Sequence, residues 1–381
     1  MSVTHPKGFV ATGIEAGLKK SGGKDLAIVQ NCGPSKAAAV VFTTNRAKAN
    51  PIIWSQQVIA DGIVEAVVLN SGGANCYTGA QGFQTTHETA EAVARRLGVS
   101  AGDVLVCSTG LIGEQLPLEK IVAGIESAEL TAHGGDDASV AIMTTDTRPK
   151  RAVVEGEGWS IGGMAKGAGM LAPGLATMLV VITTDADLSA GELDTALRAA
   201  TRTTFDRLDS DGCMSTNDQV SLLASGASGI VPGRAEFTRA LTALCADLAA
   251  QLQQDAEGAS HDIVIETANA ASEDDAVAVG RAVARNNLFK AAVFGKDPNW
   301  GRVLAAIGTT SAAFDPYEVD VSMNGVMVCR CGEPGEAREL VDLAPRRVHV
   351  LIDLKAGSAT ATILTNDLTH DYVHENSAYS S

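Results

Sequence analysis

A glycine-rich run that leads into a hydroxyl nucleophile is the feature of this sequence with the clearest chemical potential. It starts at Gly162, passes through a Pro173-Gly174 turn and reaches Ala176-Thr177, directly before the run 178–183, which is apolar through residue 182. Glycine lets the backbone adopt conformations closed to other residues and approach a ligand closely. The apolar run predicts a buried strand. Thr177 therefore lies where an irregular loop meets a core strand, a position suited to a self-processing nucleophile.

The chemistry available to Thr177 follows from its neighbours. Its hydroxyl can attack the carbonyl of Ala176, a small residue, and convert the amide to an ester that water then opens. Cleavage frees the α-amine of Thr177, whose reference pKa is about 8. That amine can act as general base for the adjacent hydroxyl. The other interpretation is a Gly/Pro connector that leads to an ordinary buried threonine.

Residues 166–179 resemble the autoprocessing signature of the ornithine acetyltransferase (glutamate N-acetyltransferase) family. The resemblance covers essentially the whole chain, because further blocks are similar to family blocks and follow in the family's order: residues 70–79, 108–110, 143–147, 215–218 and 297–302. The family often carries Asn or Ser where this chain has Gly174, at a tolerant position.

The resemblance implies a fold and a reaction. The implied fold is α+β, with stacked β-sheets flanked by helices in αββα-like layers. Cleavage between Ala176 and Thr177 would divide it into an α chain, residues 1–176, and a β chain, residues 177–381, paired as an α2β2 heterotetramer. Thr177 would take acetyl from N2-acetylornithine and pass it to glutamate, in arginine biosynthesis. We expect no metal and no cofactor, because the protein carries the acyl group. Some relatives also accept acetyl-CoA, and the sequence leaves that second activity open.

Thr109 and Gly110 are the implied oxyanion hole, acting through a hydroxyl and a backbone N–H. They follow the apolar run 104–107. Acyl transfer passes through a tetrahedral oxyanion that needs preorganised donors, which suits this assignment. Without the family, an ordinary turn after a strand explains Ser108-Thr109-Gly110 equally well.

Lys166 and a threonine of the 143–147 block are the first implied substrate contacts. Lys166 is the only cation in a long uncharged stretch, and we expect it to anchor a carboxylate. Either Thr144 or Thr145 matches the family's substrate-binding threonine. The sequence does not decide between them, since alternate residues of a strand face opposite sides.

Three further substrate contacts are implied near the end of the chain. Glu257 matches a family glutamate suited to the side-chain ammonium of ornithine, although alone it resembles a charge at a helix end. Asn376 and Ser381 match the family's C-terminal contacts. A polar C-terminus normally frays, so these two residues predict an ordered tail.

Composition excludes several classes of partner. The net charge of −16 and the absence of a basic stripe argue against nucleic acid. No apolar run is long enough to span a membrane, and the N-terminus lacks the apolar region of a secretion signal. Seven scattered cysteines without a CxxC pair indicate reduced thiols. We therefore expect a cytoplasmic protein.

The expected elements support sheets covered by helices rather than a plain parallel sheet. Helical spacing of apolar residues predicts a helix that stops at Gly98, a second helix with an apolar stripe from Phe237 to Leu252, and a cap at Ser189. Short apolar runs predict strands at 26–29, 39–42, 66–69 and 104–107.

The C-terminal quarter predicts paired strands. Asn324-Gly325 between residues 319–323 and 326–329 is a strong hairpin signal, and residues 348–354 and 359–364 suggest a second pair. No Pro- or Ser-rich linker marks a domain boundary.

Two alternative functions remain from the sequence. One is a self-cleaving amidohydrolase or aminopeptidase of the same layout that passes the acyl group to water. The other is a non-enzymatic protein that binds a small acid, in which the glycine loop merely cradles a carboxylate.

Overall fold

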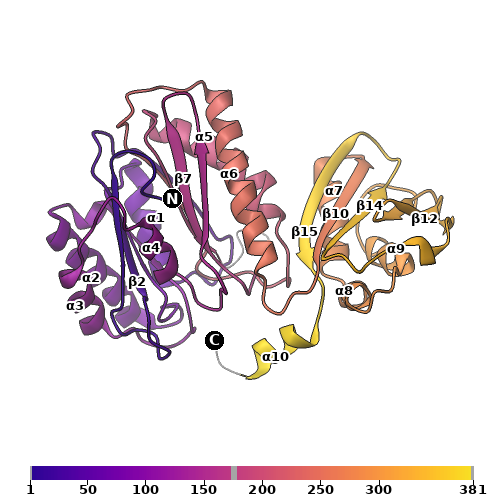
Figure 1. Ribbon diagram of the computed structural model, residues 1–381, viewed down its shortest axis with the longest axis horizontal. Helices are drawn as coiled ribbons and strands as arrows, with labels where there is room; N and C mark the ends of the chain where they lie inside the picture. The colour runs from indigo at the N-terminus through magenta and orange to yellow at the C-terminus, as the bar shows by residue number, and fades with distance from the viewer. Residues whose placement is uncertain (1, 173–177, 379–381) are drawn as a thin grey trace.

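The structure is a computed structural model that describes residues 2–172 and 178–378. Figure 1 shows a larger body, built from the N-terminal two-thirds of the chain, and a smaller C-terminal unit that holds β10 to β15. The body contains two sheets and the C-terminal unit contains a third.

The first sheet of the body has the order β1-β2-β4-β5. Only β4 and β5 are parallel. Apolar side chains on its outer face pack under α2 and α3. The predicted stop at Gly98 is confirmed, because Gly98 caps α2 with φ +71°. The elements are β1 (Phe9–Ile14), β2 (Leu26–Asn31), β4 (Ala66–Asn70), β5 (Val104–Ser108), α2 (Gly79–Leu97) and α3 (Leu118–Ser127).

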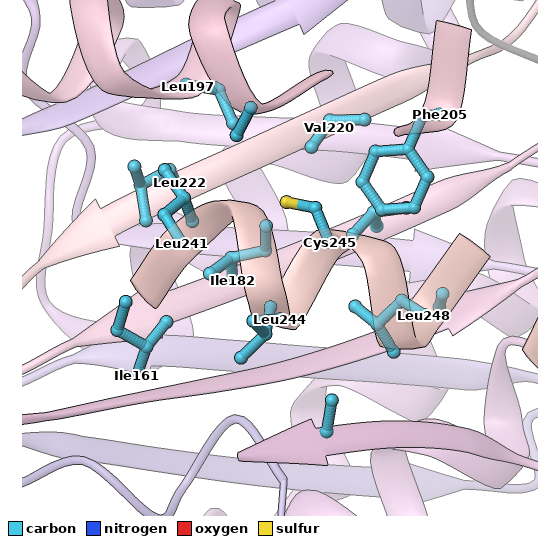
Figure 2. Close-up of a cluster of buried hydrophobic side chains, with 14 of the residues drawn as sticks. Ile161, Ile182, Leu197, Phe205, Val220, Leu222, Leu241, Leu244, Cys245 and Leu248 are labelled. Carbon is cyan, nitrogen blue, oxygen red and sulfur yellow. The ribbon is translucent and has the colours of Figure 1, made fainter. Parts of the chain in front are cut away.

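The second sheet has the order β3-β9-β8-β7-β6 and is covered by α5 and α6. The predicted stripe on α6 is confirmed, and Figure 2 shows Leu241, Leu244 and Leu248 over Ile161 and Ile182 of the sheet. The elements are β3 (Ala38–Phe42), β6 (Lys150–Glu155), β7 (Ser160–Lys166), β8 (Leu179–Thr184), β9 (Gln219–Ala224), α5 (Ala190–Thr203) and α6 (Arg234–Gln254).

The cap predicted at Ser189 is confirmed as well. Its hydroxyl accepts the N–H of Glu192, whose carboxylate in turn accepts the Ser189 N–H, so two unsatisfied donors of the first turn of α5 are used.

The two sheets of the body stack face to face. Val29 and Leu69 of the first sheet share one buried cluster with Met164 and Val181 of the second. With helices outside both sheets, the layers run helix, sheet, sheet, helix, as expected. The remaining elements of the body are α1 (Asn50–Val58), α4 (Gly135–Ala141) and the 3-10 turns η1 (Ile59–Asp61), η2 (Ala101–Asp103) and η3 (Phe205–Arg207).

The C-terminal unit has a core of its own beneath a sheet of order β13-β12-β11-β14-β10-β15. The predicted hairpin is confirmed, with Met323 opposite Val326 and positive φ at Asn324 and Gly325. The elements are β10 (Asp262–Ala270), α7 (Glu273–Ala284), α8 (Asn287–Phe294), α9 (Trp300–Ile307), β11 (Asp320–Met323), β12 (Val326–Arg330), β13 (Glu333–Pro334), η4 (Arg338–Leu340), β14 (Arg347–Asp353) and β15 (Ala359–Asn366).

The second predicted pair, residues 348–354 with 359–364, is wrong. β10 lies between β14 and β15, parallel to the first and antiparallel to the second. Strands that are close in sequence usually pair, but here a strand from far upstream is inserted between the two. Local spacing cannot reveal such a long-range insertion.

Two expectations from composition concern the whole molecule. All seven cysteines are free thiols. Across residues 2–172 and 178–378, every helix is too short or too polar to cross a membrane.

Candidate active site

A cavity of about 110 Å³ gathers the predicted site residues that the structure describes. We call it the first cavity. Segments from both sheets of the body and from the C-terminal helix supply its walls. Its lining consists of Thr109, Gly110, Thr144, Thr145, Lys166, Gly169, Met170, Glu257 and Asn376. The predicted residues Ala176, Thr177 and Ser381 lie outside the described residues.

Thr109 and Gly110 directly follow the end of β5. The N–H of Thr109 donates to the carbonyl of Asn70 at 3.0 Å, so its hydroxyl is the group available to the cavity. Gly110 has φ +127°, and a Cβ there would lie 2.9 Å from the nitrogen of Gly73. This position therefore requires glycine. Both residues line the first cavity, and a hydroxyl and a backbone N–H are the kinds of donor that an oxyanion hole needs.

Lys166 is the last residue of β7, and its side chain is 2 % exposed. Its Nζ lies 3.4 Å from the hydroxyl oxygen of Thr109 and 4.0 Å from Oδ2 of Asp146. Burial lowers the pKa of Lys166, and the nearby carboxylate of Asp146 opposes that shift. The first cavity thus contains a buried cation beside a hydroxyl donor.

Asp146 is the centre of a buried charge network. Its Oδ1 accepts from Nζ of Lys150 at 2.5 Å and from the N–H of Gly167 at 2.7 Å. Lys150 also donates to Asp255 at 2.6 Å. Burial alone would raise the pKa of Asp146, but the ammonium groups of Lys166 and Lys150 hold it below its ordinary value. The network therefore holds Gly167 in place, and with it the backbone directly after Lys166.

The sequence did not reveal this network. The motif at residues 143–147 predicts substrate contacts for its threonines and gives no local signal for Asp146. The available signal was an opposite charge four residues later at Lys150, a spacing that usually marks an exposed pair on a helix. Instead, Lys150 is the first residue of β6, Asp146 lies in the irregular segment before it, and both side chains are buried.

Thr144 and Thr145 both line the first cavity. They belong to the irregular segment between α4 and β6, so the alternation of a strand does not apply to them. The N–H of Thr144 donates to Oδ2 of Asp146 at 3.0 Å, which ties this segment to the charge network.

Glu257 and Asn376 meet on the far wall of the first cavity. Nδ2 of Asn376 donates to Oε2 of Glu257 at 2.9 Å, and the N–H of Glu257 donates to the carbonyl of Ala168 at 3.0 Å. Asn376 lies on α10 (His370–Ala378), which runs back from the C-terminal unit toward the body (Figure 1). The carboxylate packs so closely on Gly169 that a Cβ there would lie 2.6 Å from it.

Asn217 and Asp218 also belong to this region, although the sequence assigned them no role. The N–H of Met178 donates to Oδ1 of Asp218 at 3.0 Å, and burial raises the pKa of that carboxyl well above its usual range. Asn217 donates to the carbonyls of Ala74 and Ser108 at 2.6 and 2.8 Å. These two side chains hold the segment after residue 177 beside Thr109.

The layered fold and the first cavity, with donors and a buried ammonium around one small space, define an α+β enzyme of acyl transfer. The ArgJ family model matches residues 10–381. The chain therefore belongs to the ArgJ family and is an enzyme of arginine biosynthesis, which confirms the resemblance found in residues 166–179 and rules out a non-enzymatic binding protein.

Several relatives are similar over the full chain. The arginine biosynthesis bifunctional protein ArgJ of Streptomyces coelicolor is 64% identical over 383 residues, covering 100% of both chains. That of Thermobifida fusca is 61% identical with the same coverage.

Two solved structures are similar to parts of the chain. The arginine biosynthesis bifunctional protein argJ of Bacillus halodurans is 35% identical, with a TM-score of 0.50, covering 52% of this chain and 97% of that chain. Ornithine acetyltransferase of Mycobacterium tuberculosis complexed with ornithine is 51% identical, with a TM-score of 0.45, covering 47% and 96%.

Proposed function

We propose that the protein transfers an acetyl group from N2-acetylornithine to glutamate through an acetyl-Thr177 intermediate. The observation that carries the proposal is the composition of the first cavity. A buried ammonium at Lys166 and a hydroxyl at Thr109 face the same space as the carboxylate of Glu257. A donor with an acyl amide, a carboxylate and an ammonium matches these three groups.

In the proposed first half-reaction, the Thr177 hydroxyl attacks the acetyl carbonyl of the donor. The α-amine of Thr177 takes the hydroxyl proton and delivers it to the departing amine of ornithine. The hydroxyl of Thr109 and the N–H of Gly110 donate to the oxyanion as it forms. In the second half-reaction, the amine of glutamate attacks the acetyl ester, the α-amine of Thr177 passes its proton to the departing Thr177 oxygen, and N-acetylglutamate leaves with the hydroxyl restored.

The substrate contacts divide by charge. Lys166 binds the carboxylate that both substrates carry on their α-carbon, because it is the cation of the first cavity. Glu257 binds the side-chain ammonium of ornithine and is oriented by Asn376. Thr144 and Thr145 offer hydroxyls on the same cavity, and Ser381 completes the set at the C-terminus.

The proposed cleavage between Ala176 and Thr177 is compatible with the fold. β7 precedes the bond and β8 follows it, and the two strands pair antiparallel with Lys166 opposite Leu179. An α chain of residues 1–176 and a β chain of residues 177–381 would therefore remain joined in one sheet. The Bacillus halodurans chain supports the division, since about half of this chain accounts for nearly all of that one.

The proposal extends to assembly, location and a second donor. We place the cleaved chains in an α2β2 heterotetramer in the cytoplasm, where a biosynthetic enzyme with seven free thiols is expected. The relatives are named bifunctional, which supports acetyl-CoA as a further acetyl donor to glutamate.

The test is to supply N-acetylornithine labelled in its acetyl carbon together with glutamate. We expect labelled N-acetylglutamate and free ornithine in equal amounts, with little free acetate. Labelled acetate as the main product would instead show a self-cleaving amidohydrolase or aminopeptidase. A parallel reaction with labelled acetyl-CoA measures the second activity.

A further inference from the structure

A second cavity of about 250 Å³ adjoins the first. Glu257 lines both cavities. Helix α10 also contributes to both, through Tyr372 in the second cavity and Asn376 one turn later in the first, and Nδ2 of Asn376 donates to the Tyr372 carbonyl at 3.0 Å. A ligand seated in the first cavity therefore has the second as its neighbouring space.

Lys290 supplies the positive charge of the second cavity. It lies on α8, is only 6% exposed, and donates to the carbonyl of Ser210. No carboxylate oxygen of residues 2–172 and 178–378 lies within 4.0 Å of its Nζ. An ammonium has three N–H donors, so a single carbonyl leaves it able to bind an anion. Burial lowers the pKa of Lys290, and Asp211, Asp209 and Asp367 oppose that shift.

Asp211 supplies an acidic side chain whose protonation state can change with the ligand. Burial raises the pKa of its carboxyl to about 6, against the partial compensation of hydrogen bonds from the N–H groups of Cys213 and Met170. Asp367, also in the second cavity, is already engaged. Its Oδ2 lies 2.7 Å from the ring Nδ1 of His261, and its Oδ1 accepts the backbone N–H of His261 at 2.9 Å. Among the charged side chains that line the second cavity, Asp367 has an ion-pair partner within the described residues, whereas Asp211, Glu257 and Lys290 have none.

The proposed reaction places an unusual demand on the enzyme. Donor and acceptor use the same acyl-carrying residue and share an α-carboxylate, so their side chains must extend in the same direction. The donor side chain ends in an ammonium and the acceptor side chain in a carboxylate. A subsite of one charge would repel one of them, because an unpaired charge in a buried space is costly.

We propose that the second cavity is a shared distal subsite, where Asp211 joins Glu257 in binding the side-chain ammonium of the donor and Lys290 binds the side-chain carboxylate of the acceptor. This inference rests on the proposed function. An acid with a pKa of about 6 supports it, since such an acid ionises readily beside a cation and takes up a proton readily beside a second carboxylate.

The test measures the two half-reactions separately in Lys290→Gln and Asp211→Asn. Lys290→Gln should raise the KM for glutamate about 10- to 100-fold, the value of a buried charged hydrogen bond. It should leave the release of ornithine from N-acetylornithine within about twofold of wild type, and this unchanged half-reaction also shows that the variant is folded. Asp211→Asn should chiefly raise the KM for N-acetylornithine.

Glutamine as acceptor provides the internal control, since it lacks the distal charge. Lys290→Gln should hardly change the KM for glutamine, and Lys290→Arg should keep most of the affinity for glutamate. Lys296→Gln, at an exposed lysine just after the same helix, is the matched surface control.

An unchanged KM for glutamate in Lys290→Gln would overturn the inference, as would an equal loss of both half-reactions. If the wild-type enzyme transferred no acetyl to glutamate, the proposed function itself would fail. The two failures are therefore distinguishable.

Discussion

The ammonium nitrogen of Lys166 lies 3.4 Å from the hydroxyl oxygen of Thr109, and this contact joins the two stacked sheets of the body. Lys166 ends β7 of one sheet, and Thr109 follows β5 of the other. The first cavity therefore forms at the edge where the two layers meet, and its donors are held by the core on both sides.

Thr177→Ala should abolish both chain cleavage and acetyl transfer, because it removes the only hydroxyl proposed to attack either carbonyl. A denaturing gel or intact mass should show one uncut chain of 381 residues. Thr195→Ala, at an exposed threonine on α5, should be processed and active like wild type. Two fragments from Thr177→Ala would refute the nucleophile assignment.

Thr109→Val should reduce kcat by roughly 10²- to 10³-fold, the usual effect of deleting one oxyanion donor. Thr109→Ser keeps the hydroxyl and should retain most of the activity. Steady-state kinetics on the processed enzymes compares the two. Wild-type kcat in Thr109→Val would show that the hydroxyl does not stabilise the oxyanion.

Gly169→Ala should impair substrate binding without unfolding the protein. The new Cβ would lie 2.6 Å from the Glu257 carboxylate, which is the mobile end of its side chain and can shift away. Displacing a binding group in this way should lower kcat/KM for N-acetylornithine roughly 10- to 100-fold. Gly191→Ala, where a Cβ meets nothing within 4 Å, should leave kcat/KM unchanged. If Gly169→Ala had wild-type kinetics, Glu257 would not be a substrate-binding residue.

Asp146→Asn should destabilise the fold by about 3–5 kcal/mol, because it leaves the buried ammonium groups of Lys150 and Lys166 short of a counter-charge. Denaturant unfolding measures the difference. The control is Asp194→Asn, which breaks an exposed pair with Arg198 and should cost less than about 1 kcal/mol. A similar small cost in both variants would mean that the buried network contributes little to stability.

Asp211 should make the protein less stable as the pH rises from 3.8 toward about 6. Its pKa is raised from 3.8 in the unfolded chain to about 6 in the fold, so between these values the folded state binds more protons. This stabilisation is fully present below 3.8 and is lost above about 6. The difference in unfolding free energy between wild type and Asp211→Asn should therefore change across this window. If this difference stayed constant across the window, the pKa of the Asp211 carboxyl would not be raised in the fold.

Local signals in the sequence correctly predicted several elements of the body and of the C-terminal unit. The stop at Gly98, the cap at Ser189 and the hairpin at Asn324-Gly325 each depend on a few neighbouring residues, whose backbone preferences act before any tertiary contact forms. The apolar stripe of α6 was predicted from apolar residues that recur at helical spacing, which is also a local property of the sequence.

The sequence by itself determined the family and named the candidate site residues, since the glycine-rich run before Thr177 and the motifs at residues 108–110 and 143–147 can be recognised without a fold. Only the tertiary structure decided the strand order around β10, the burial of Lys150 with Asp146, and the meeting of Lys290 and Asp211 in one cavity. These depend on segments far apart in the chain. Their pairing is chosen by the free energy of burying the whole core, which no short stretch of residues encodes.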